Sequence, residues 1–491
     1  MSQRSLFRLL GPPGLVAGLS AASVVVASAS FFVITPPIDL SLPSPFADCT
    51  VGGPGTNYPN SEVEPWVAVN PTNPNTIVAV FQQDRWSNGG AHGLVAKTSH
   101  NGGASWSTSW AHFSTCSGGT AANGGDYDRA SDPWVTIAPN GDVFQISLSA
   151  SADLVTSAVL VSKSTDGGDT WAEPTTLIKD SSPFNFNDKE SITADPTKPG
   201  YVYAVWDRSR LPSENADINA LHSYAFRGDV MFARTTNGGA SWEPARDVLP
   251  RNANLSTIGN QIIVLPDGTL LDVFNLLKGS GNQPHGLQTF QAVMRSTDKG
   301  MSWSSPIIIS SEEAVAVIDP DNGRALRTGT GLPDIAVDQS NGSLYVVWEG
   351  SRFSGHMYND IALSRSTDGG LTWSAPIRAN TTPVAVPAFT PSVEVAADGT
   401  VAVAYYDFRN NDPTAGLPTG YWMVHSHDYG LTFDAESLIL LFDEEKAPFA
   451  RGYFLGDYVG LTTAGNLFLT VFITTETDAN PTDAFVVYAE P

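Results

Sequence analysis

Acidic residues and arginines recur along this chain at matching positions of short strand-like runs. Acidic residues lie at or just before one set of runs, at Glu64, Asp132, Glu190, Asp334 and Asp457. Arginines follow the next run each time, in Trp206-Asp-Arg208, Trp348-Glu-Gly-Ser-Arg352 and Tyr406-Asp-Phe-Arg409, and more loosely in Phe81-Gln-Gln-Asp-Arg85. A guanidinium fork binds a carboxylate well. Neighbouring carboxyl groups can acquire different pKa values, so that one serves as acid and another as base. The pattern therefore indicates a site for an acidic ligand.

The separation between each acid and its arginine is nearly constant. It is 21 residues from Glu64 to Arg85 and 18 from both Glu190 to Arg208 and Asp334 to Arg352. Antiparallel pairing of two short strands would place each acid beside its arginine. Two interpretations stay open on the sequence. The pairs are either ion pairs repeated with each duplicated unit, or a subset of them forms a ligand pocket.

An eight-residue phrase shows which elements must position these residues. Its six copies begin 60 to 71 residues apart, at Ser99–Trp106, Ser164–Trp171, Thr235–Trp242, Ser296–Trp303, Ser366–Trp373 and Ser426–Phe433. The third position is Asp or Asn, which can accept hydrogen bonds from backbone N–H groups in a turn, and the fifth is Gly, which tolerates positive φ. The closing Trp or Phe offers a large apolar surface for burial. Each phrase predicts a structural hairpin corner.

A fixed period of this size with short strands between the phrases is typical of a β-propeller. Strand-like runs at 66–69 and 76–81 precede the first phrase, and a last unit at 458–488 has three runs and no phrase. The segment 31–42 could supply its fourth strand, which would remove a free sheet edge. We predict an all-β propeller of four-stranded antiparallel blades, seven in number with six as the alternative, closed by an N-terminal strand.

The phrase, Ser/Thr-x-Asp/Asn-x-Gly-x-Ser/Thr-Trp/Phe, resembles the Asp-box, or BNR repeat, of the sialidase superfamily. All six copies match it at each defined position. The whole pattern, with Phe454-Leu-Gly-Asp-Tyr458, looks most like secreted bacterial sialidase-like proteins. The resemblance implies that the boxes join third and fourth strands on the face away from the active site.

The same resemblance implies roles for individual residues. In that family a tyrosine activated by a Glu is the nucleophile, an Asp is the acid/base and three arginines bind the substrate carboxylate. The nucleophile lies in Tyr-Ser-x-Leu, and here Tyr458-Val-Gly-Leu461 keeps Tyr and Leu but not Ser. The family's Phe/Tyr-Arg-Ile-Pro motif is absent from 30–491. The expected catalytic residues are Tyr458, Glu190 and Asp132, and the expected substrate-binding residues are Arg85, Arg208, Arg352 and Arg409.

Composition narrows the classes of partner and cofactor that the chain could bind. The chain has 491 residues, 42% of them hydrophobic, and a net charge of −24. Such a charge argues against nucleic acid or an anionic membrane as partner. A Gly-x-Ser-x-Gly elbow, a Gly-rich loop before a helix and zinc-type Cys/His spacing are all missing from the sequence. We therefore expect no cofactor, no metal and a monomer that meets a glycan or glycoconjugate.

The N-terminus has the features of an export signal. Arg4 and Arg8 precede an apolar stretch, and Ala27-Ser-Ala29 is a cleavage site of the A-x-A type. Residues 1–29 are thus predicted to be a signal peptide, with a retained anchor as the alternative, and residues 30–491 one domain that is secreted or cell-surface. The two cysteines, Cys49 and Cys116, are expected to form a disulfide in that oxidising compartment.

Three functions remain open on the sequence. One is a secreted exo-glycosidase that acts on acidic sugars at the axial face. The second is a non-catalytic propeller that binds a glycan or protein there. The third is a surface or envelope scaffold anchored by an uncleaved signal. Whether the arginines are free in a pocket or each bound to an acid distinguishes them.

Overall fold

The computed structural model describes residues 30–41, 43–210, 227–249, 255–279, 287–412, 414, 416–477 and 479–491. The predicted signal peptide, 1–29, lies outside the described residues. Within them the protein is all-β, as predicted, with short 3₁₀ turns at η2 (Arg352–Ser354) and η3 (Glu444–Lys446). Among these same residues, none forms a helix long and apolar enough to cross a bilayer.

The strands pair into antiparallel sets of four. The first sets are β3 (Glu62–Val69), β4 (Ile77–Arg85), β5 (Ala91–Ser99) and β6 (Ser107–Ser109); β7 (Arg129–Ile137), β8 (Val143–Ala150), β9 (Thr156–Ser164) and β10 (Thr175–Ser181); and β11 (Asn185–Ala194), β12 (Val202–Arg210), β13 (Arg227–Thr235) and β14 (Arg246–Asp247). The next are β15 (Leu255–Val264), β16 (Leu270–Gly279), β17 (Leu287–Ser296) and β18 (Ile307–Ser311); β20 (Asp334–Val337), β21 (Leu344–Gly350), β22 (Asp360–Ser366) and β23 (Ile377–Arg378); and β24 (Ala388–Val395), β25 (Val401–Asp407), β26 (Pro418–Ser426) and β27 (Ser437–Asp443).

The last sheet joins the two ends of the described chain. It contains β29 (Gly460–Ala464), β30 (Leu467–Thr477) and β31 (Asn480–Glu490), and both β1 (Val33–Ile34) and β2 (Ile38–Asp39) pair antiparallel with β31. The register sets Val33 opposite Glu490. One further pair is parallel, between β19 (Leu326–Arg327) and β28 (Tyr453–Phe454).

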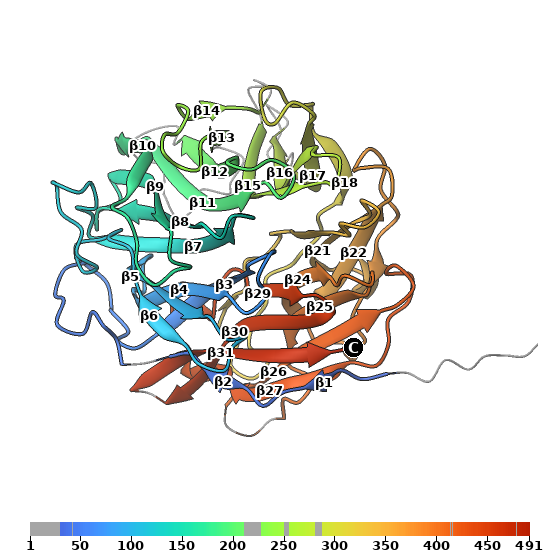
Figure 1. Cartoon of the computed structure of the whole chain (residues 1–491). Helices are drawn as coiled ribbons and strands as arrows, with labels where there is room; N and C mark the ends of the chain where they lie inside the picture. Colours follow the sequence, from blue (N-terminus) through green and yellow to red (C-terminus); the bar gives the residue numbers. More distant parts are fainter. Residues whose placement is uncertain are drawn as a thin grey trace, which may run out of the picture.

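The first strands of the sets surround a common centre. They contact one another in the order β3, β7, β11, β15, β20, β24 and β29, and β29 contacts β3 in turn. Figure 1 shows the sheets radiating outward from these inner strands. This is the arrangement of propeller blades. Residues near the N-terminal ends of the first strands therefore meet at the axis.

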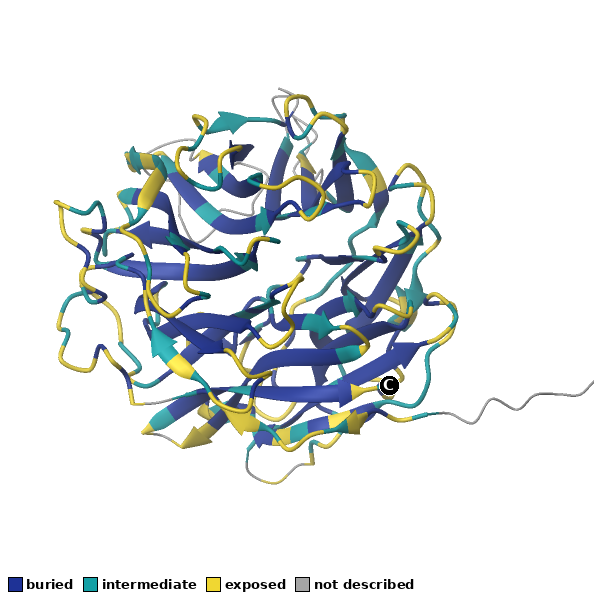
Figure 2. Ribbon diagram, in the orientation of Figure 1, coloured by how far each residue is buried: buried dark blue, intermediate teal, exposed yellow. Residues whose placement is uncertain are grey.

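The hydrophobic core lies between neighbouring sheets. The strand interiors are buried and the connecting turns are largely exposed (Figure 2). Trp206 and Trp348 have no exposed surface, and Tyr406 is 1% exposed. These three aromatics therefore pack the core and are unavailable to a ligand.

The box phrases form the predicted hairpin corners. In Ser366–Trp373, the Asp368 carboxylate accepts a hydrogen bond from the backbone N–H of Thr372 at 2.9 Å. The Ser366 hydroxyl accepts one from the N–H of Gly370, also at 2.9 Å. Trp373 packs against the cluster that includes Leu344 and Trp348. The hydrogen-bonding role predicted for the third residue is confirmed in this turn.

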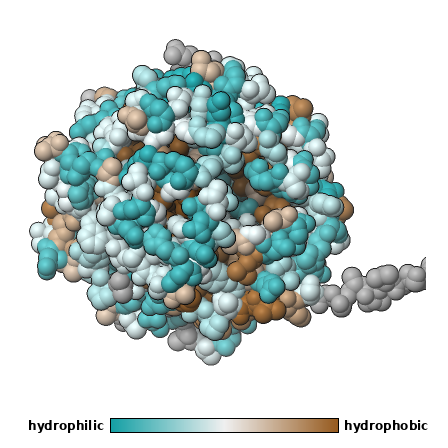
Figure 3. Space-filling view, viewed as in Figure 1, coloured by the Kyte–Doolittle hydropathy of each residue, from teal (hydrophilic) through white to brown (hydrophobic). Residues whose placement is uncertain are grey.

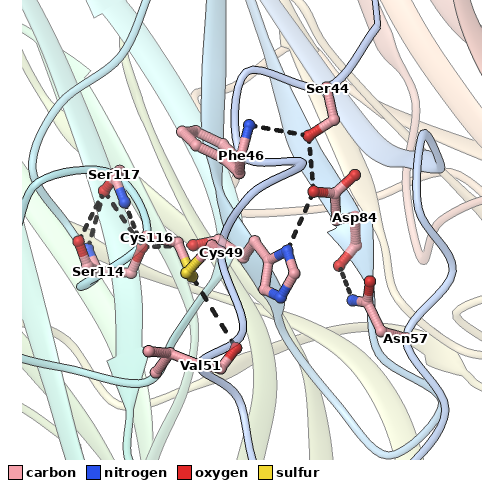
Figure 4. The surroundings of a disulfide bond; sticks show 10 residues. Ser44, Phe46, Cys49, Val51, Asn57, Asp84, Ser114, Cys116 and Ser117 are labelled. Carbon is pink, nitrogen blue, oxygen red and sulfur yellow. Dashed lines mark hydrogen bonds and ion pairs between the residues drawn. A yellow bond between two sulfur atoms is a disulfide. The ribbon is translucent and has the colours of Figure 1, made fainter.

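A disulfide joins Cys49 and Cys116, as predicted, across 67 residues of sequence. It ties the N-terminal segment to the loop between β6 and β7 (Figure 4). Nearby, the Ser44 hydroxyl donates to Asp84 at 2.6 Å, and His92 bonds the same carboxylate at 3.0 Å. The segment before β3 is thus fixed to the blade surface by covalent and polar contacts.

Candidate functional site

A β-bulge recurs in the first strands and aims side chains at the axis. The pairing register shifts between Val63 and Trp66 in β3, and between Ser131 and Trp134 in β7. The same shift occurs in β11, β15 and β24. The first bulged residue has positive φ in all five strands: Glu64, Asp132, Lys189, Gly259 and Thr390. Such backbone is costly for a residue with a side chain and tends to occur at functional positions.

Three of these bulged side chains meet at one point. The Lys189 ammonium lies 2.9 Å from Glu64 Oε1 and 3.0 Å from Asp132 Oδ1. It also lies 2.7 Å from Asp457 Oδ2, just before β29. All four side chains are at least nine-tenths buried. Despite the burial, these carboxylates raise the pKa of Lys189 well above its usual range, so the ammonium stays charged.

The parallel pair of β19 and β28 brings two more cations to this centre. It sets Arg327 opposite Phe454, and Arg451 precedes Phe454 by three residues. Arg327 donates to both carboxylate oxygens of Asp457, from Nε at 3.0 Å and from Nη2. Gly329 has φ of 67°, and a Cβ there would collide with the carbonyl oxygen of Asp457. Only glycine allows this segment to approach so closely.

A cavity of about 490 Å³ lies at the centre of the ring, and its lining includes Asp132, Lys189, Arg327, Arg451 and Asp457. On the face drawn in Figure 3, hydrophilic residues cover most of the surface, and hydrophobic ones are visible in the hollow near the middle. The charged residues of the lining are Arg85, Arg129, Asp132, Asp188, Lys189, Glu312, Arg327, Arg451 and Asp457, and apolar ones include Leu148, Phe186 and Leu277. The volume suits one or two sugar rings.

Three of the four cavity arginines, Arg85, Arg129 and Arg451, lack an acidic partner in the described part of the chain. Arg129 is held instead by the carbonyls of Gly52, Gly89 and Pro54 and by the Asn88 amide oxygen, which leaves Arg85 and Arg451. Within the described residues, neither Arg85 nor Arg451 has a carboxylate oxygen within 4.0 Å. Arg85 donates to the amide oxygen of Gln82 at 2.7 Å and lies over the Phe454 ring, which Arg327 also covers. Burial and the charge of Arg327 lower the pKa of Arg85 to about 10. The same two causes lower the pKa of Arg451. An anion in the cavity would relieve this repulsion.

Two cavity carboxyl groups have pKa values shifted in opposite directions. Burial, and then the charge of Asp457, raise the pKa of Asp188 above its usual value, although Lys189 and Arg327 oppose the change. Burial would also raise the pKa of Asp457, but Arg327 and Lys189 outweigh it and hold that pKa well below its ordinary range. Asp188 thus holds a proton more readily than an ordinary carboxyl group, and Asp457 less readily.

A second, narrower cavity of about 30 Å³ holds Glu190 and Tyr458. It shares Lys189 and Asp457 with the main cavity. The Tyr458 hydroxyl donates to the Pro133 carbonyl at 3.1 Å. Burial, followed by the charges of Glu64 and Asp132, raises the pKa of Tyr458 well above its usual value.

Glu190 is 2% exposed, and neither of its carboxyl oxygens has a hydrogen-bond partner in the described part of the chain. Burial, then Asp132, raises its pKa well above normal. Burial thus favours the neutral form of this carboxyl group over the charged one.

The structure brings together only some of the residues predicted from the sequence. Asp132 and Arg85 line the main cavity, and Glu190 and Tyr458 line the narrow one. Arg208, Arg352 and Arg409 line neither. Arg208 is bound to Asp180 at 2.6 Å, and Arg352 donates to the Ser311 carbonyl at 2.6 Å.

Arg409 is held in the same way, by the Asp407 carboxylate at 2.6 Å and by Glu436. Its guanidinium also lies 3.9 Å from the centre of the Trp422 ring. The structural interpretation of repeated acid–arginine contacts therefore describes these three arginines, although with other acids than the sequence indicated.

The expected pairing of strand-start acids with arginines was wrong. Glu190 has no partner, and Asp334 accepts from the Ser392 hydroxyl at 2.6 Å instead of binding Arg352. For Glu190 the reason is the bulge in β11, which turns the side chains of its two residues away from the regular hairpin register. Strand β20 pairs with β21 without such a shift, so the bulge does not account for Asp334.

Sequence reasoning missed six charged residues of the cavity: Arg129, Asp188, Lys189, Glu312, Arg327 and Arg451. The available signal for the bulge was a repeated acid–Pro dipeptide directly before a Trp, at Glu64-Pro65 and Asp132-Pro133. They align with Lys189-Glu190. Nothing comparable marks Arg327 or Arg451, which lie between blades.

Comparison with known proteins gives similarity of structure alone. No protein-family model and no curated protein sequence matches the chain. The Hadza microbial sialidase Hz136 is 15% identical, with a TM-score of 0.48 over 84% of this chain and 73% of that one. The leech intramolecular trans-sialidase is 12% identical, with a TM-score of 0.45 over 92% and 97%. Sialidases are thus among the structures that this chain resembles. An α-L-arabinanase of Penicillium chrysogenum is 11% identical, with a TM-score of 0.45 over 93% and 98%.

Proposed function

We propose that this chain is a secreted, sialidase-like propeller that binds the terminal acidic sugar of a glycan in its axial cavity and hydrolyses the glycosidic bond. In this proposal residues 1–29 are removed on export, and residues 30–491 form one monomeric domain of seven blades closed by the N-terminal strand. The ligand is a glycan or glycoconjugate, at the cell surface or outside the cell.

The observation that carries the proposal is that neither Arg85 nor Arg451 has an acidic partner in the described part of the chain. Arg85 and Arg451 hold positive charge in the cavity of a protein whose net charge is −24. A sugar carboxylate between them would gain charge-assisted hydrogen bonds that water supplies poorly in a partly enclosed site. The apolar lining at Leu148, Phe186 and Leu277 offers contact to the C–H face of a sugar ring.

The residues offer two routes for the hydrolysis. In the first, Asp188 gives a proton to the leaving oxygen, a water molecule bonds to the anomeric carbon and gives up a proton to restore Asp188, and the charged Asp457 stabilises the positive charge that develops on the sugar ring. In the second, the deprotonated Glu190 takes the proton of Tyr458, which bonds to the anomeric carbon while Asp132 as the acid protonates the leaving oxygen. Water then displaces Tyr458 and releases the sugar. The second route requires Lys189 to move, because its ammonium lies 5.3 Å from the centre of the Tyr458 ring and borders both cavities.

The alternative is a propeller that binds a glycan or protein without catalysis. The position of Tyr458 favours it, because the hydroxyl is already bonded to Pro133 and lines a cavity of only about 30 Å³. In this alternative the arginines bind the acidic ligand in the same cavity, and no bond is broken.

The test is hydrolysis of a fluorogenic sialoside and a panel of fluorogenic uronides, together with calorimetric binding of free sialic and uronic acids. Wild type would be compared with Asp188→Asn, Tyr458→Phe and Arg451→Met, and with Arg365→Met as a control outside the cavity. Arg451 keeps much of its surface accessible to solvent, although the cavity wall desolvates its guanidinium enough to lower its pKa, so its replacement should leave folding intact.

Turnover that Asp188→Asn abolishes and Tyr458→Phe preserves would support the carboxylate route, and the opposite result the tyrosine route. Binding without turnover, lost in Arg451→Met and kept in Arg365→Met, would establish the non-catalytic alternative. Neither turnover nor binding of any acidic sugar would overturn the proposal.

A further inference from the structure

A cluster of two histidines and one aspartate lies outside both cavities. His425 is on β26, and His427 follows two residues later, so both side chains leave the same face of the strand. Their ring centres are 4.9 Å apart. The N–H of Asp434 donates to the carbonyl of His425 at 2.9 Å, which fixes the carboxylate beside the two rings. One ligand atom from each residue lies within 4.8 Å of the others.

A fourth polar atom comes from the start of the described chain. The Ser30 hydroxyl lies 3.0 Å from His425 Nε2 and 3.1 Å from Asp434 Oδ2. Asp434 Oδ2 in turn lies 3.4 Å from His425 Nε2 and 3.9 Å from His427 Nε2. Four ligands at 2.0–2.1 Å in tetrahedral geometry stand about 3.3 Å from one another. Three of the measured separations, at 3.0, 3.1 and 3.4 Å, are close to that edge length. The fourth, at 3.9 Å, is longer, and the exposed His427 ring must move toward Asp434 to close it.

From this geometry we propose that Ser30, His425, His427 and Asp434 form a binding site for one divalent transition metal ion, with Zn²⁺ as its preferred occupant. Two imidazoles and a carboxylate are borderline donors that suit Zn²⁺ far better than Ca²⁺ or Mg²⁺. The ion would join the segment leading into β1 to the turn after β26. The site is independent of the proposed function, because none of these residues lines the axial cavity.

The hydrogen bonds around the two histidines affect how tightly the site would bind the metal ion. Nδ1 of His427 is 3.1 Å from the Thr400 hydroxyl. In the tautomer with its proton on Nδ1, this nitrogen donates to the hydroxyl and Nε2 is free for the metal. Nδ1 of His425 is buried without a hydrogen-bond partner in the described part of the chain. A ligating histidine that lacks this support binds metal about 10–100-fold more weakly. We therefore expect binding about 10–100-fold weaker than at a site in which both histidines are supported.

The experiment uses the exported protein, purified without a polyhistidine tag, stripped with chelator and titrated with ZnCl₂ in a calorimeter. One equivalent of Zn²⁺ should bind and raise the melting temperature. His427→Ala and Asp434→Asn should lose both effects. The matched control is His100→Ala, because His100 bonds Asp169 at 2.9 Å in another box turn, without a second histidine. His425 is wholly buried and so is left unchanged.

Titration with CoCl₂ adds a reading of geometry. The four-ligand site predicts intense visible absorption bands of tetrahedral Co²⁺, and Zn²⁺ should displace them. Two results would overturn the proposal: no stoichiometric binding of Zn²⁺ to wild type, or equal binding to wild type, His427→Ala and Asp434→Asn. Binding that is equally strong for Ca²⁺ would also contradict the assigned metal.

Discussion

The ammonium nitrogen of Lys189 lies 2.7 Å from Oδ2 of Asp457, although the two residues are 268 positions apart in the chain. The contact crosses the centre of the ring from Lys189 in the bulge of β11 to Asp457 in the segment just before β29. The same ammonium also binds Glu64 and Asp132. One buried cation therefore holds carboxylates from three separate blades.

Replacement of Lys189 by Met should destabilise the protein strongly. The three carboxylates would face one another in a buried site without their common cation, and breaking a buried ion pair typically costs about 3–5 kcal/mol. Urea denaturation at pH 7 would measure the loss. The exposed Lys198→Met is the control. A loss below that of the control would show that the cluster is hydrated and weakly coupled.

Removal of the Glu349 carboxyl group should change how stability depends on pH. Burial raises the pKa of Glu349 from 4.5 to about 8. A raised carboxyl pKa stabilises the folded state below the unfolded value, and this contribution is lost as the pH rises through 8.

Wild type should therefore be less stable at pH 8.5 than at pH 5, by on the order of 2–4 kcal/mol from this group alone at about 1.4 kcal/mol per pKa unit. Glu349→Gln should reduce that difference, and the exposed Glu490→Gln should not. Denaturation midpoints of wild type and both variants, measured at pH 5 and pH 8.5, would give these differences in stability. An unchanged difference in Glu349→Gln would contradict the assignment.

The double variant Cys49→Ser/Cys116→Ser should lose stability. The bridge closes a loop across 67 residues, for which the loss of chain entropy corresponds to about 4 kcal/mol. Calorimetry of both proteins would give the difference in melting temperature. Intact-mass analysis of the exported wild type should find no free thiol, and two free thiols would refute the bridge.

Truncation of the box tryptophan Trp171 to Ala should cost about 3 kcal/mol, at the lower end for large aromatics because the ring is only half-buried. Its indole N–H donates to the Ser109 hydroxyl in the preceding blade at 2.9 Å, so the truncation also breaks a contact between blades. The Ser109→Ala variant isolates the hydrogen bond. An unchanged melting temperature in Trp171→Ala would show that the box aromatics do not support the ring.

Replacement of Glu190 by Met should stabilise the protein by about 1 kcal/mol at pH 7, because an orphaned buried carboxyl group gives way to an apolar side chain of similar shape. If Glu190 serves the tyrosine route, the same variant loses turnover. The combination of gained stability and lost activity would mark a residue kept for function. A lower melting temperature would instead show that the carboxyl group is bonded in solution.

The fold was predictable because its signals are local and repeated. The hydrogen bonds of Asp368 and the hairpin corner it forms follow from eight consecutive residues. The candidate site was less predictable from the sequence than the fold. Arg327 and Asp457 meet across 130 residues through a two-residue parallel pair, and such pairs leave no periodic trace in the sequence. Lys189 was missed because a bulge, rather than strand alternation, decides where its side chain points.

The last sheet has a consequence for resistance to proteolysis. Strand β31 is paired with β30 on one side and with β1 and β2 on the other, so neither end of the described chain is a loose strand. Partial unfolding from an end must first break this shared sheet, which packs on β3 through β29 and β30. Proteases act on segments that open, and the rate of opening then limits degradation. The protein should therefore persist in a protease-rich environment for longer than its equilibrium stability alone would give.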